Sequence, residues 1–110
     1  MIDLSKQSFS TNKITGFDWD KGNIDKSYEK HGIKPEEAEQ VFLDVGLQVE
    51  RSIKHEQKEK RFIAIGEIPA GKILFIVFTM RNTEIRVVSA RVANKTERRR
   101  YAEAKKNTLL

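Results

Sequence analysis

Apolar and polar residues follow two different periods along the chain, and the change falls near the middle. In the first half, Ala38, Val41 and Phe42 recur at the spacing of one helix face, which predicts a helix over residues 35–43. Pro35 suits the first position of that helix, and the glutamates near its start favour the positive end of the helix dipole. We expect this helix to place its apolar stripe on the core.

An earlier helix is predicted from the cap Asp20 to about Lys30, with Gly32 ending it in the left-handed conformation. Residues 1–16 are polar and rich in turn-forming residues, which predicts a flexible lead-in. The remaining length, residues 17–110, is that of one domain.

In the second half the period shortens toward two, which predicts β-strands. Four segments are rich in β-branched and aromatic residues: 47–53, 59–66, 72–80 and 85–91. Turn signals at residues 68–71 and 82–83 join the last three segments as hairpins, so the sheet should be antiparallel. A final helix should begin after Asn94, with Glu97 completing a capping box, and run to about Lys106. The expected fold class is α+β, with N-terminal helices packed on a four-stranded antiparallel sheet and a basic C-terminal helix.

The hairpin turns also predict which side chains share a face of the sheet. A two-residue turn at 82–83 puts six residues on one face: Phe75, Val77, Thr79, Arg86, Val88 and Ala90. A four-residue turn at 68–71 adds three more: Lys60, Phe62 and Ala64. One end of this face is then cationic, with Lys60, Arg81 and Arg86, and cations on a strand need water, a carboxylate or a phosphate. A one-residue slip would bring Arg61 into this group.

The charge of the chain is concentrated near its C-terminus. The formal net charge is +5, with 21 Lys and Arg against 16 Asp and Glu. Residues 81–110 hold 9 basic and 3 acidic residues, net +6, whereas residues 1–80 hold 12 and 13, net −1. Such a basic region is typical of a surface that binds a polyanion, although a solvated helix face has the same pattern.

Composition excludes several other classes of protein. The chain has no cysteine, so disulfides, a catalytic thiol and thiolate metal ligands are absent from the sequence. The longest apolar run, Ile73–Phe78, is too short to cross a bilayer, and the first residues lack the apolar core of a secretory signal. We expect a cytoplasmic protein that does not enter the membrane.

The residue types favour one kind of chemistry over two others. Metal-assisted hydrolysis needs convergent carboxylates or histidines, and no spacing indicates such a cluster or any other cofactor site. Catalysis by Ser or Thr needs a neighbouring base, which no spacing nominates. Metal-free RNA cleavage needs less, because the 2′-hydroxyl of the substrate attacks the adjacent phosphate. Arginines, lysines, a histidine and a tyrosine are sufficient for it, and the chain has all four.

Several segments in order along the chain resemble the BrnT family, the toxins of type II toxin-antitoxin pairs. They are Phe17-Asp18-Trp19-Asp20, Lys30-His31-Gly32, Glu36-Glu37-Ala38, Arg61-Phe62-Ile63-Ala64-Ile65-Gly66, Phe78-Thr79-Met80-Arg81, Ile85-Arg86-Val87-Val88-Ser89-Ala90-Arg91 and Glu97-Arg98-Arg99-Arg100-Tyr101. The resemblance spans about residues 17 to 103. Many relatives have Lys at the position of Asn23 and Ser or Thr at that of Lys34.

The resemblance implies a RelE-like fold and a metal-independent endoribonuclease that arrests growth. It also implies a cognate BrnA-like antitoxin with a ribbon-helix-helix DNA-binding part, through which the complex would bind operator DNA. RNA is the implied substrate, and no cofactor is implied.

The site residues implied by the resemblance fall into two sets. The catalytic set is His55, Arg61, Arg81, Arg86 and Tyr101, and the RNA-binding set is Lys54, Lys60, Arg91 and Arg98. In the first set, Arg81 and Arg86 would bind the phosphate in the transition state, and His55 would move protons because its usual pKa lies near neutrality.

Structural roles remain open for several of these residues. Arg61 could pair only with Glu59, and Tyr101 could simply pack on the sheet. Arg91 and Arg98 could anchor the last helix, and Trp19 is expected in the core. The alternative function is a non-catalytic basic binding module, or an inactive toxin that acts as a co-repressor with a DNA-binding antitoxin.

Overall fold

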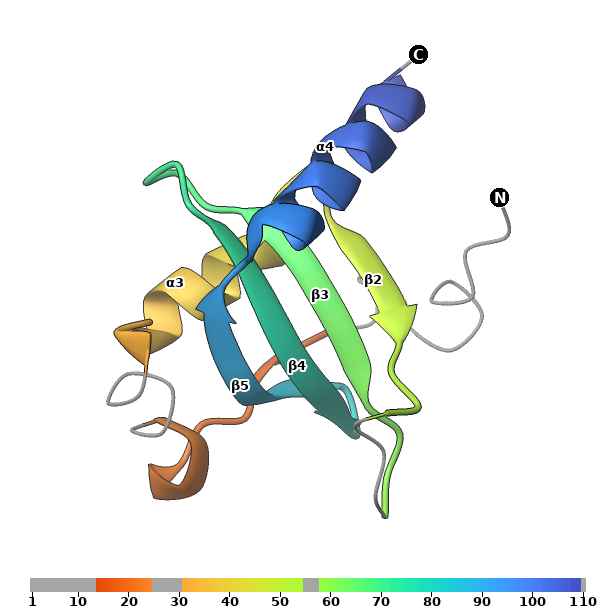
Figure 1. The fold of residues 1–110 in the computed structure, drawn as a ribbon. Helices are drawn as coiled ribbons and strands as arrows, with labels where there is room; N and C mark the ends of the chain where they lie inside the picture. Colours follow the sequence, from red (N-terminus) through yellow and green to blue (C-terminus); the bar gives the residue numbers. More distant parts are fainter. Residues whose placement is uncertain (1–13, 25–30, 55–57, 110) are drawn as a thin grey trace.

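The structure, a computed structural model, describes residues 14–24, 31–54 and 58–109 (Figure 1). Its centre is a five-stranded sheet in the order β1-β5-β4-β3-β2. The strands are β1 (Gly16–Phe17), β2 (Gln48–Arg51), β3 (Phe62–Glu67), β4 (Ile73–Arg81) and β5 (Glu84–Val92). Helix α3 (Pro35–Val41) and helix α4 (Lys95–Leu109) complete the described elements. The α+β class and the C-terminal helix predicted from the sequence are confirmed, whereas the predicted four-stranded antiparallel sheet is not.

The predicted four-stranded sheet is incomplete, because β1 adds a fifth strand that runs parallel to β5. Its pairing places Gly16 opposite Glu84 and Phe17 opposite Ile85, and Ile14 also packs against the core. The sheet is therefore mixed, and the predicted lead-in does not extend to residue 16. A strand of two residues has no period that a sequence pattern could show. Residues 1–13 lie outside the described part of the chain.

One face of the sheet is covered by α3, which lies behind the strands in Figure 1. Ala38 and Val41, on the predicted stripe, are fully buried there against Ile76 and Phe78 of the central strand. Phe42 continues the contact, with its ring edge-on to that of Phe78 at 5.1 Å between centroids. The helix begins as predicted at Pro35, and the Glu37 carboxylate accepts a hydrogen bond from the Lys34 N–H.

The opposite face of the sheet, which we call the open face, differs from the prediction along β3. The β3–β4 connection is a three-residue loop, Pro69–Gly71, in which the Ile68 N–H donates to the Lys72 carbonyl. Gly71 takes a positive φ of 90°, which closes such a loop. The pairing shifts by one residue relative to the predicted four-residue turn, so Phe62 and Ala64 face the core. Lys60 therefore leaves the cationic group, and Arg61 joins it.

The pairing of β4 with β5 is as predicted near the turn and then shifts by one residue. Arg81 lies opposite Glu84 and Thr79 opposite Arg86, but Val77 pairs with Ser89 rather than with Val88. Val88 is the extra residue of a β-bulge between these two stretches. Beyond the bulge, Ala90 faces the core and Arg91 lies opposite Phe75, which corrects the predicted pairing of Phe75 with Ala90.

Two helix starts and one helix-ending glycine agree with the predictions from the sequence. Residues 21–24 are helical, and the Asp20 carboxylate accepts from the Gly22 N–H at the start of that turn. Residues 25–30 lie outside the described part, and Gly32 has the predicted positive φ, 72°. At the start of α4, Asn94 and Glu97 exchange the two hydrogen bonds of a capping box, both 2.8 Å, as predicted.

Helix α4 is held at the end of the sheet where β3 stops and β4 starts. The Asp44 carboxylate, in the α3–β2 loop, accepts hydrogen bonds from the N–H groups of Gly46 and Glu67 and from the Tyr101 hydroxyl. Lys105 pairs with Glu67 at 3.8 Å. One carboxylate thus joins the loop, β3 and α4.

Candidate active site

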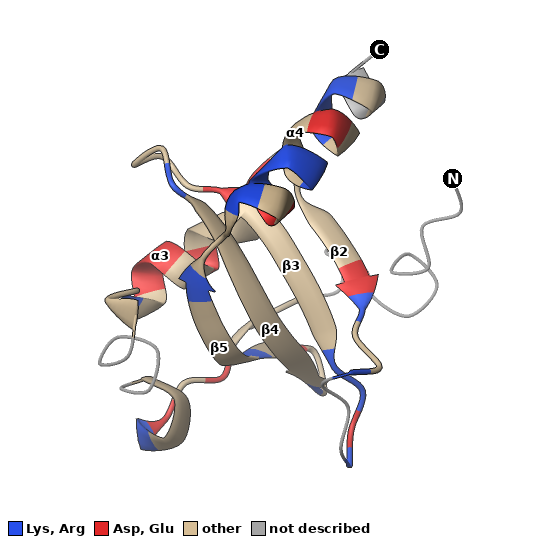
Figure 2. Cartoon of the chain, viewed as in Figure 1, with Lys and Arg blue, Asp and Glu red and all other residues tan. Residues whose placement is uncertain are grey.

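Several positive residues lie at the end of the sheet where β4 turns into β5, away from α4 (Figure 2). Arg61 precedes β3, Arg81 ends β4 and Arg86 lies on β5, and together we call them the arginine cluster. They line a cavity of about 140 Å³ with Glu59 and Thr79. The sequence predicted Arg81 and Arg86 together, and the three-residue loop adds Arg61.

Glu59 lies between two of these arginines. Its carboxylate accepts from the Nε and Nη2 of Arg81 at 3.2 and 3.1 Å, and Arg61 Nη2 is 3.8 Å away. The hydrogen bond from Arg81 is the main reason that the pKa of Glu59 is lowered, with the charges of Arg61 and Arg86 adding to it. Glu59 is therefore ionised at neutral pH and holds the two guanidinium groups together.

Arg86 is held from the other side by two aspartates of the segment after β1. Its two terminal nitrogens each donate to Asp20 at 3.0 Å, and Asp18 lies 3.5 Å away. This pairing lowers the pKa of Asp20 and raises that of Arg86. The Arg86 side chain is 17% exposed, whereas that of Asp20 is 58% exposed.

Asn23 fixes the position of those aspartates. Its side chain is buried, and its Nδ2 donates to the carbonyls of Asp18 and Val87 at 2.9 and 3.1 Å. Its Oδ1 accepts from the Asp20 N–H at 2.8 Å. Asn23 therefore joins the acidic segment to β5 at the cavity wall, and a longer cationic side chain could not accept the bond from Asp20.

Arg61 leaves one hydrogen-bond donor of the site unused. Its side chain is 16% exposed, and among the described residues its Nε is the buried side-chain polar atom that has no hydrogen-bond partner. A buried donor without a partner is costly, and an oxygen of a bound anion would satisfy it. The cavity is thus lined by three guanidinium-bearing residues, and the buried Nε of one of them has no hydrogen-bond partner.

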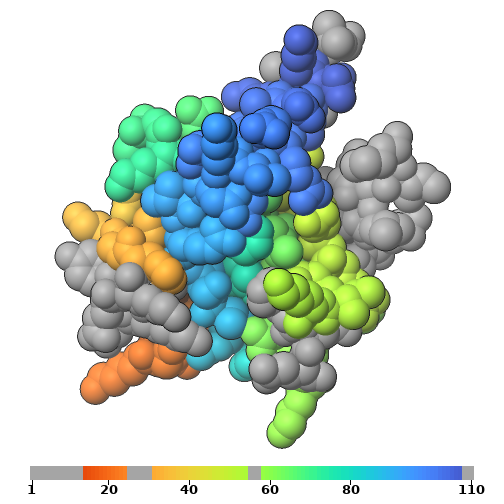
Figure 3. Space-filling view, in the orientation of Figure 1, coloured from red at the N-terminus to blue at the C-terminus, as the bar shows by residue number. Residues whose placement is uncertain are grey.

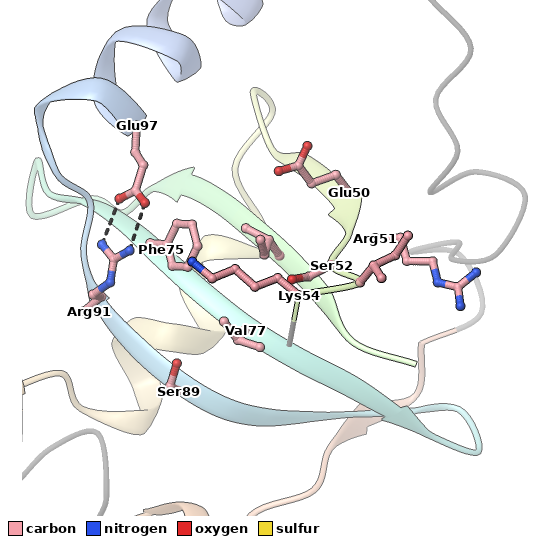
Figure 4. Close-up of a pocket in the computed structure, with 11 residues that line it drawn as sticks. Glu50, Arg51, Ser52, Lys54, Phe75, Val77, Ser89, Arg91 and Glu97 are labelled. Carbon is pink, nitrogen blue, oxygen red and sulfur yellow. Dashed lines mark hydrogen bonds and ion pairs between the residues drawn. The ribbon is translucent and has the colours of Figure 1, made fainter. Parts of the chain in front are cut away.

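A second hollow of the open face lies between β5 and the β2 side of the sheet (Figures 3 and 4). We call it the sheet groove; its volume is about 430 Å³, and its lining includes Ser52, Lys54, Phe75, Val77, Ser89 and Arg91. The Arg91 guanidinium carbon lies 4.1 Å from the centre of the Phe75 ring. Glu97 accepts from both terminal nitrogens of Arg91 at 2.8 Å, which raises the pKa of Arg91.

The other predicted site residues that the structure describes do not line the cavity of the arginine cluster. Tyr101 is buried at the opposite end of the sheet, where its hydroxyl donates to Asp44. Arg98 donates to the Ala93 carbonyl at 2.8 Å, and Lys60 is exposed. Lys54 lines the sheet groove, and His55 lies outside the described residues. Trp19 packs against the core as expected, donating to Glu39.

Sequence reasoning missed the acidic half of this site. Glu59 was considered only as a partner of Arg61, and Asp18 and Asp20 only as the start of a helix. Their separation in sequence from Arg86, 66 residues for Asp20, gives no local signal. Asn23 carried one signal, since it departs from the Lys of many relatives.

The model of the BrnT family, ribonuclease toxins of type II toxin-antitoxin systems, matches residues 19–97. Among solved structures, the ribonuclease toxin BrnT of Brucella abortus, determined at 1.1 Å, aligns with a TM-score of 0.52 and 24% identity. The alignment covers 73% of this chain and 97% of that chain, and it shows a shared fold. No curated protein sequence matches the chain.

The family match includes the whole arginine cluster and all strands from β2 to β5, and it places the chain in one class of protein, the ribonuclease toxins. The chain belongs to the BrnT family of type II toxin-antitoxin systems. Its substrate class is RNA, and its partner is an antitoxin; the non-catalytic alternative is not favoured. None of the described helices is long and apolar enough to cross a membrane.

Tyr101→Phe separates a structural from a catalytic role for the tyrosine. We expect a loss of about 1 to 2 kcal/mol of folding stability, because Asp44 loses a donor, and unchanged RNA cleavage by the folded variant. Burial raises the pKa of Asp44, but the bonds from Tyr101, Glu67 and Gly46 outweigh it and lower the pKa below the usual 3.8. The folding stability that these bonds contribute is therefore present above pH 3.8, the usual pKa of an aspartate, and is lost as the pH falls through the lower pKa of Asp44.

The stability difference between wild type and Tyr101→Phe should therefore be constant near neutral pH and narrow below about pH 4. Urea unfolding at several pH values measures it. A variant that stays folded but no longer cleaves RNA would return Tyr101 to the active site.

Proposed function

We propose that the chain is a metal-independent endoribonuclease whose arginine cluster binds the scissile phosphate. The adjacent 2′-hydroxyl of the RNA attacks the phosphorus, and the bond from phosphorus to the 5′-oxygen of the next nucleotide breaks, so that this oxygen leaves as a hydroxyl after taking up a proton. The observation that carries the proposal is the convergence of Arg61, Arg81 and Arg86 on one cavity. Guanidinium groups fixed before substrate arrives stabilise the charge that develops in the transition state. The RelE-like fold implied by the resemblance and a single domain over residues 17–110 are part of the same proposal.

In the free protein, carboxylates occupy the donors of the arginine cluster that the substrate phosphate would use. The three arginines are balanced by Glu59, Asp18 and Asp20, so an incoming phosphate competes with them for the same donors. Asp20 is the easiest to displace because its side chain is largely exposed and returns to water. Exchange of one anion for another keeps the charge of the cavity low in both states.

Two groups can move the protons that this reaction requires. Glu59 is an ionised carboxylate at the cavity, and once phosphate occupies Arg81 it is free to accept the 2′-hydroxyl proton. His55 remains the sequence-based choice for a proton shuttle. The two differ in pH dependence: a Glu59 base gives a rate that rises with pH at acidic values, whereas a His55 base places that rise near neutrality.

The residues near the cluster do not form a metal site. In residues 14–24, 31–54 and 58–109, no three His, Asp or Glu side chains come close enough to hold one ion. The carboxylates that do approach the cavity are engaged by arginines. This donor set supports positioning by cations of the protein.

Arg86→Ala tests the cluster. We expect relief of growth arrest on induced expression and about a hundredfold slower RNA cleavage, because a donor to the transition state is lost. Arg99→Ala, on the exposed side of α4, is the matched control and should retain toxicity. Circular dichroism confirms folding of both variants. Full toxicity of a folded Arg86→Ala protein would remove Arg86 from the site.

Chelation and a 2′-deoxy substrate test whether the reaction needs a metal and whether the nucleophile belongs to the RNA. We expect cleavage to proceed in EDTA and to leave 2′,3′-cyclic phosphate ends, because the attacking group belongs to the RNA. An oligonucleotide with a single 2′-deoxy residue at the cut should be inert, while the same change one nucleotide further on should have little effect. Activity that disappears in EDTA and returns with magnesium contradicts the mechanism.

The antitoxin partner, we propose further, is BrnA-like, with a ribbon-helix-helix part through which the complex binds operator DNA in the cytoplasm. Such a partner inhibits by covering the open face, where basic residues lie beside apolar Phe75 and Val77. Acidic side chains would pair with the basic residues, and apolar side chains would cover the strip.

Salt titration distinguishes the two complexes of the open face. RNA binding should weaken steeply with salt, because each neutralised phosphate releases counterions. Antitoxin binding should weaken much less, because part of its interface is apolar. Calorimetry or anisotropy over a range of salt measures both. Equal slopes would mean that the antitoxin binds by charge alone.

A further inference from the structure

The sheet groove contains a planar cation that is fixed before any ligand binds. Arg91 contacts the Phe75 ring at 4.1 Å, and both of its terminal nitrogens donate to Glu97. Glu97 is itself held by the Asn94 N–H in the capping box of α4, and its side chain is 14% exposed. The guanidinium plane therefore has little freedom, while the Arg91 side chain remains 35% exposed.

The surroundings of this cation differ from those of the arginine cluster. The lining of the sheet groove includes the apolar side chains of Ile63, Phe75 and Val77, with the hydroxyls of Ser52 and Ser89 among them (Figure 4). Glu97 already neutralises Arg91, so a phosphate gains little there. The lining also includes charged residues, Glu50, Arg51 and Lys54. Apolar side chains and a fixed guanidinium plane, with hydroxyl and charged groups around them, suit a flat group with polar edges, which is the chemistry of a nucleobase.

The sheet groove and the arginine cluster lie side by side on the open face. Thr79 lines the cavity of the cluster and Val77 lines the groove, two residues earlier on the same strand. Side chains two apart on a strand share a face and are separated by about 7 Å. An RNA strand with one phosphate in the cluster can therefore place a neighbouring base in the groove.

We propose that the sheet groove is a base-binding subsite, in which one unstacked base next to the cleaved phosphate stacks on the Arg91–Phe75 pair. The inference rests on the proposed function and adds to it a determinant of sequence preference. Ser52, Ser89 and Lys54 contact the edge of that base. A single base held this way is worth about 5- to 150-fold in affinity, from 1 to 3 kcal/mol per stacked base.

The test crosses protein variants with abasic substrates. Short RNA oligonucleotides carry one abasic residue at each position around the cut, and cleavage efficiency is measured for wild type, Arg91→Lys and Arg99→Lys. Both substitutions keep the charge, but only the first removes the guanidinium plane from Phe75. At one position beside the cut, we expect the abasic residue to slow wild type and Arg99→Lys about tenfold. Arg91→Lys should cleave intact RNA more slowly than wild type does. The abasic residue at that position should slow this variant no further.

A second variant guards against a folding defect in the first. Ser89→Leu fills the sheet groove without changing charge, and Thr96→Leu, exposed on α4, is its matched control. Ser89→Leu should behave like Arg91→Lys, and Thr96→Leu like wild type. The subsite proposal is wrong if an abasic residue lowers the cleavage efficiency of all the proteins equally, or if it lowers the efficiency at no position. So does a Ser89→Leu protein that handles RNA normally but binds antitoxin weakly, since the groove would then be a protein-docking surface.

The same scan on binding separates this inference from the proposed function. Oligonucleotides with 2′-deoxy residues cannot be cleaved by the proposed mechanism, yet they present the same bases and phosphates. If wild type fails to cleave RNA but its binding shows the position-specific abasic loss, the mechanism is wrong and the subsite stands. If cleavage follows the proposed mechanism and no abasic position matters, only the subsite is wrong.

Discussion

The β-bulge at Val88 is the constraint on which both faces of the sheet depend. A regular strand from Arg86 onward would turn Ala90 to the open face and Arg91 into the core. The extra residue reverses the alternation, so Val87 and Ala90 both remain buried while Arg86 and Arg91 both lie on the open face. Burying a guanidinium among Ile76 and Leu74 would cost several kcal/mol, which makes the bulge the favourable solution.

The hydrogen bonds that hold α4 and the proposed active site lie at opposite ends of the sheet. At one end, Asp44 joins the α3–β2 loop, β3 and α4 through three hydrogen bonds. At the other end, the arginine cluster is held by carboxylates that belong to two separate segments of the chain, Glu59 before β3 and the two aspartates after β1. A substitution at one end should therefore have little effect on the structure at the other end, because the apolar central strands lie between them.

The carboxylates of the active site have a physical role in the free protein. Three guanidinium groups around a cavity of about 140 Å³ would repel one another if Glu59, Asp18 and Asp20 were absent. Paired with these acids, they are pre-positioned, and in the proposed function an anionic substrate would replace one set of oxygens with another. A BrnT toxin can thus keep its basic face folded and ready without a bound ligand.

The sequence by itself determined the elements of this protein and the family. Period, caps and turn residues located α3, the four long strands and the capping box of α4, because each depends on neighbours within a few residues. Arg81 and Arg86 could be paired across one hairpin for the same reason. The tertiary structure decided what depends on distant parts of the chain: the one-residue shift that admits Arg61 and excludes Lys60, the bulge at Val88, the two-residue strand β1, and the acids that hold the arginines. Alternative strand pairings that differ by one residue in register have similar local sequence signals. Packing against the whole core decides which pairing forms.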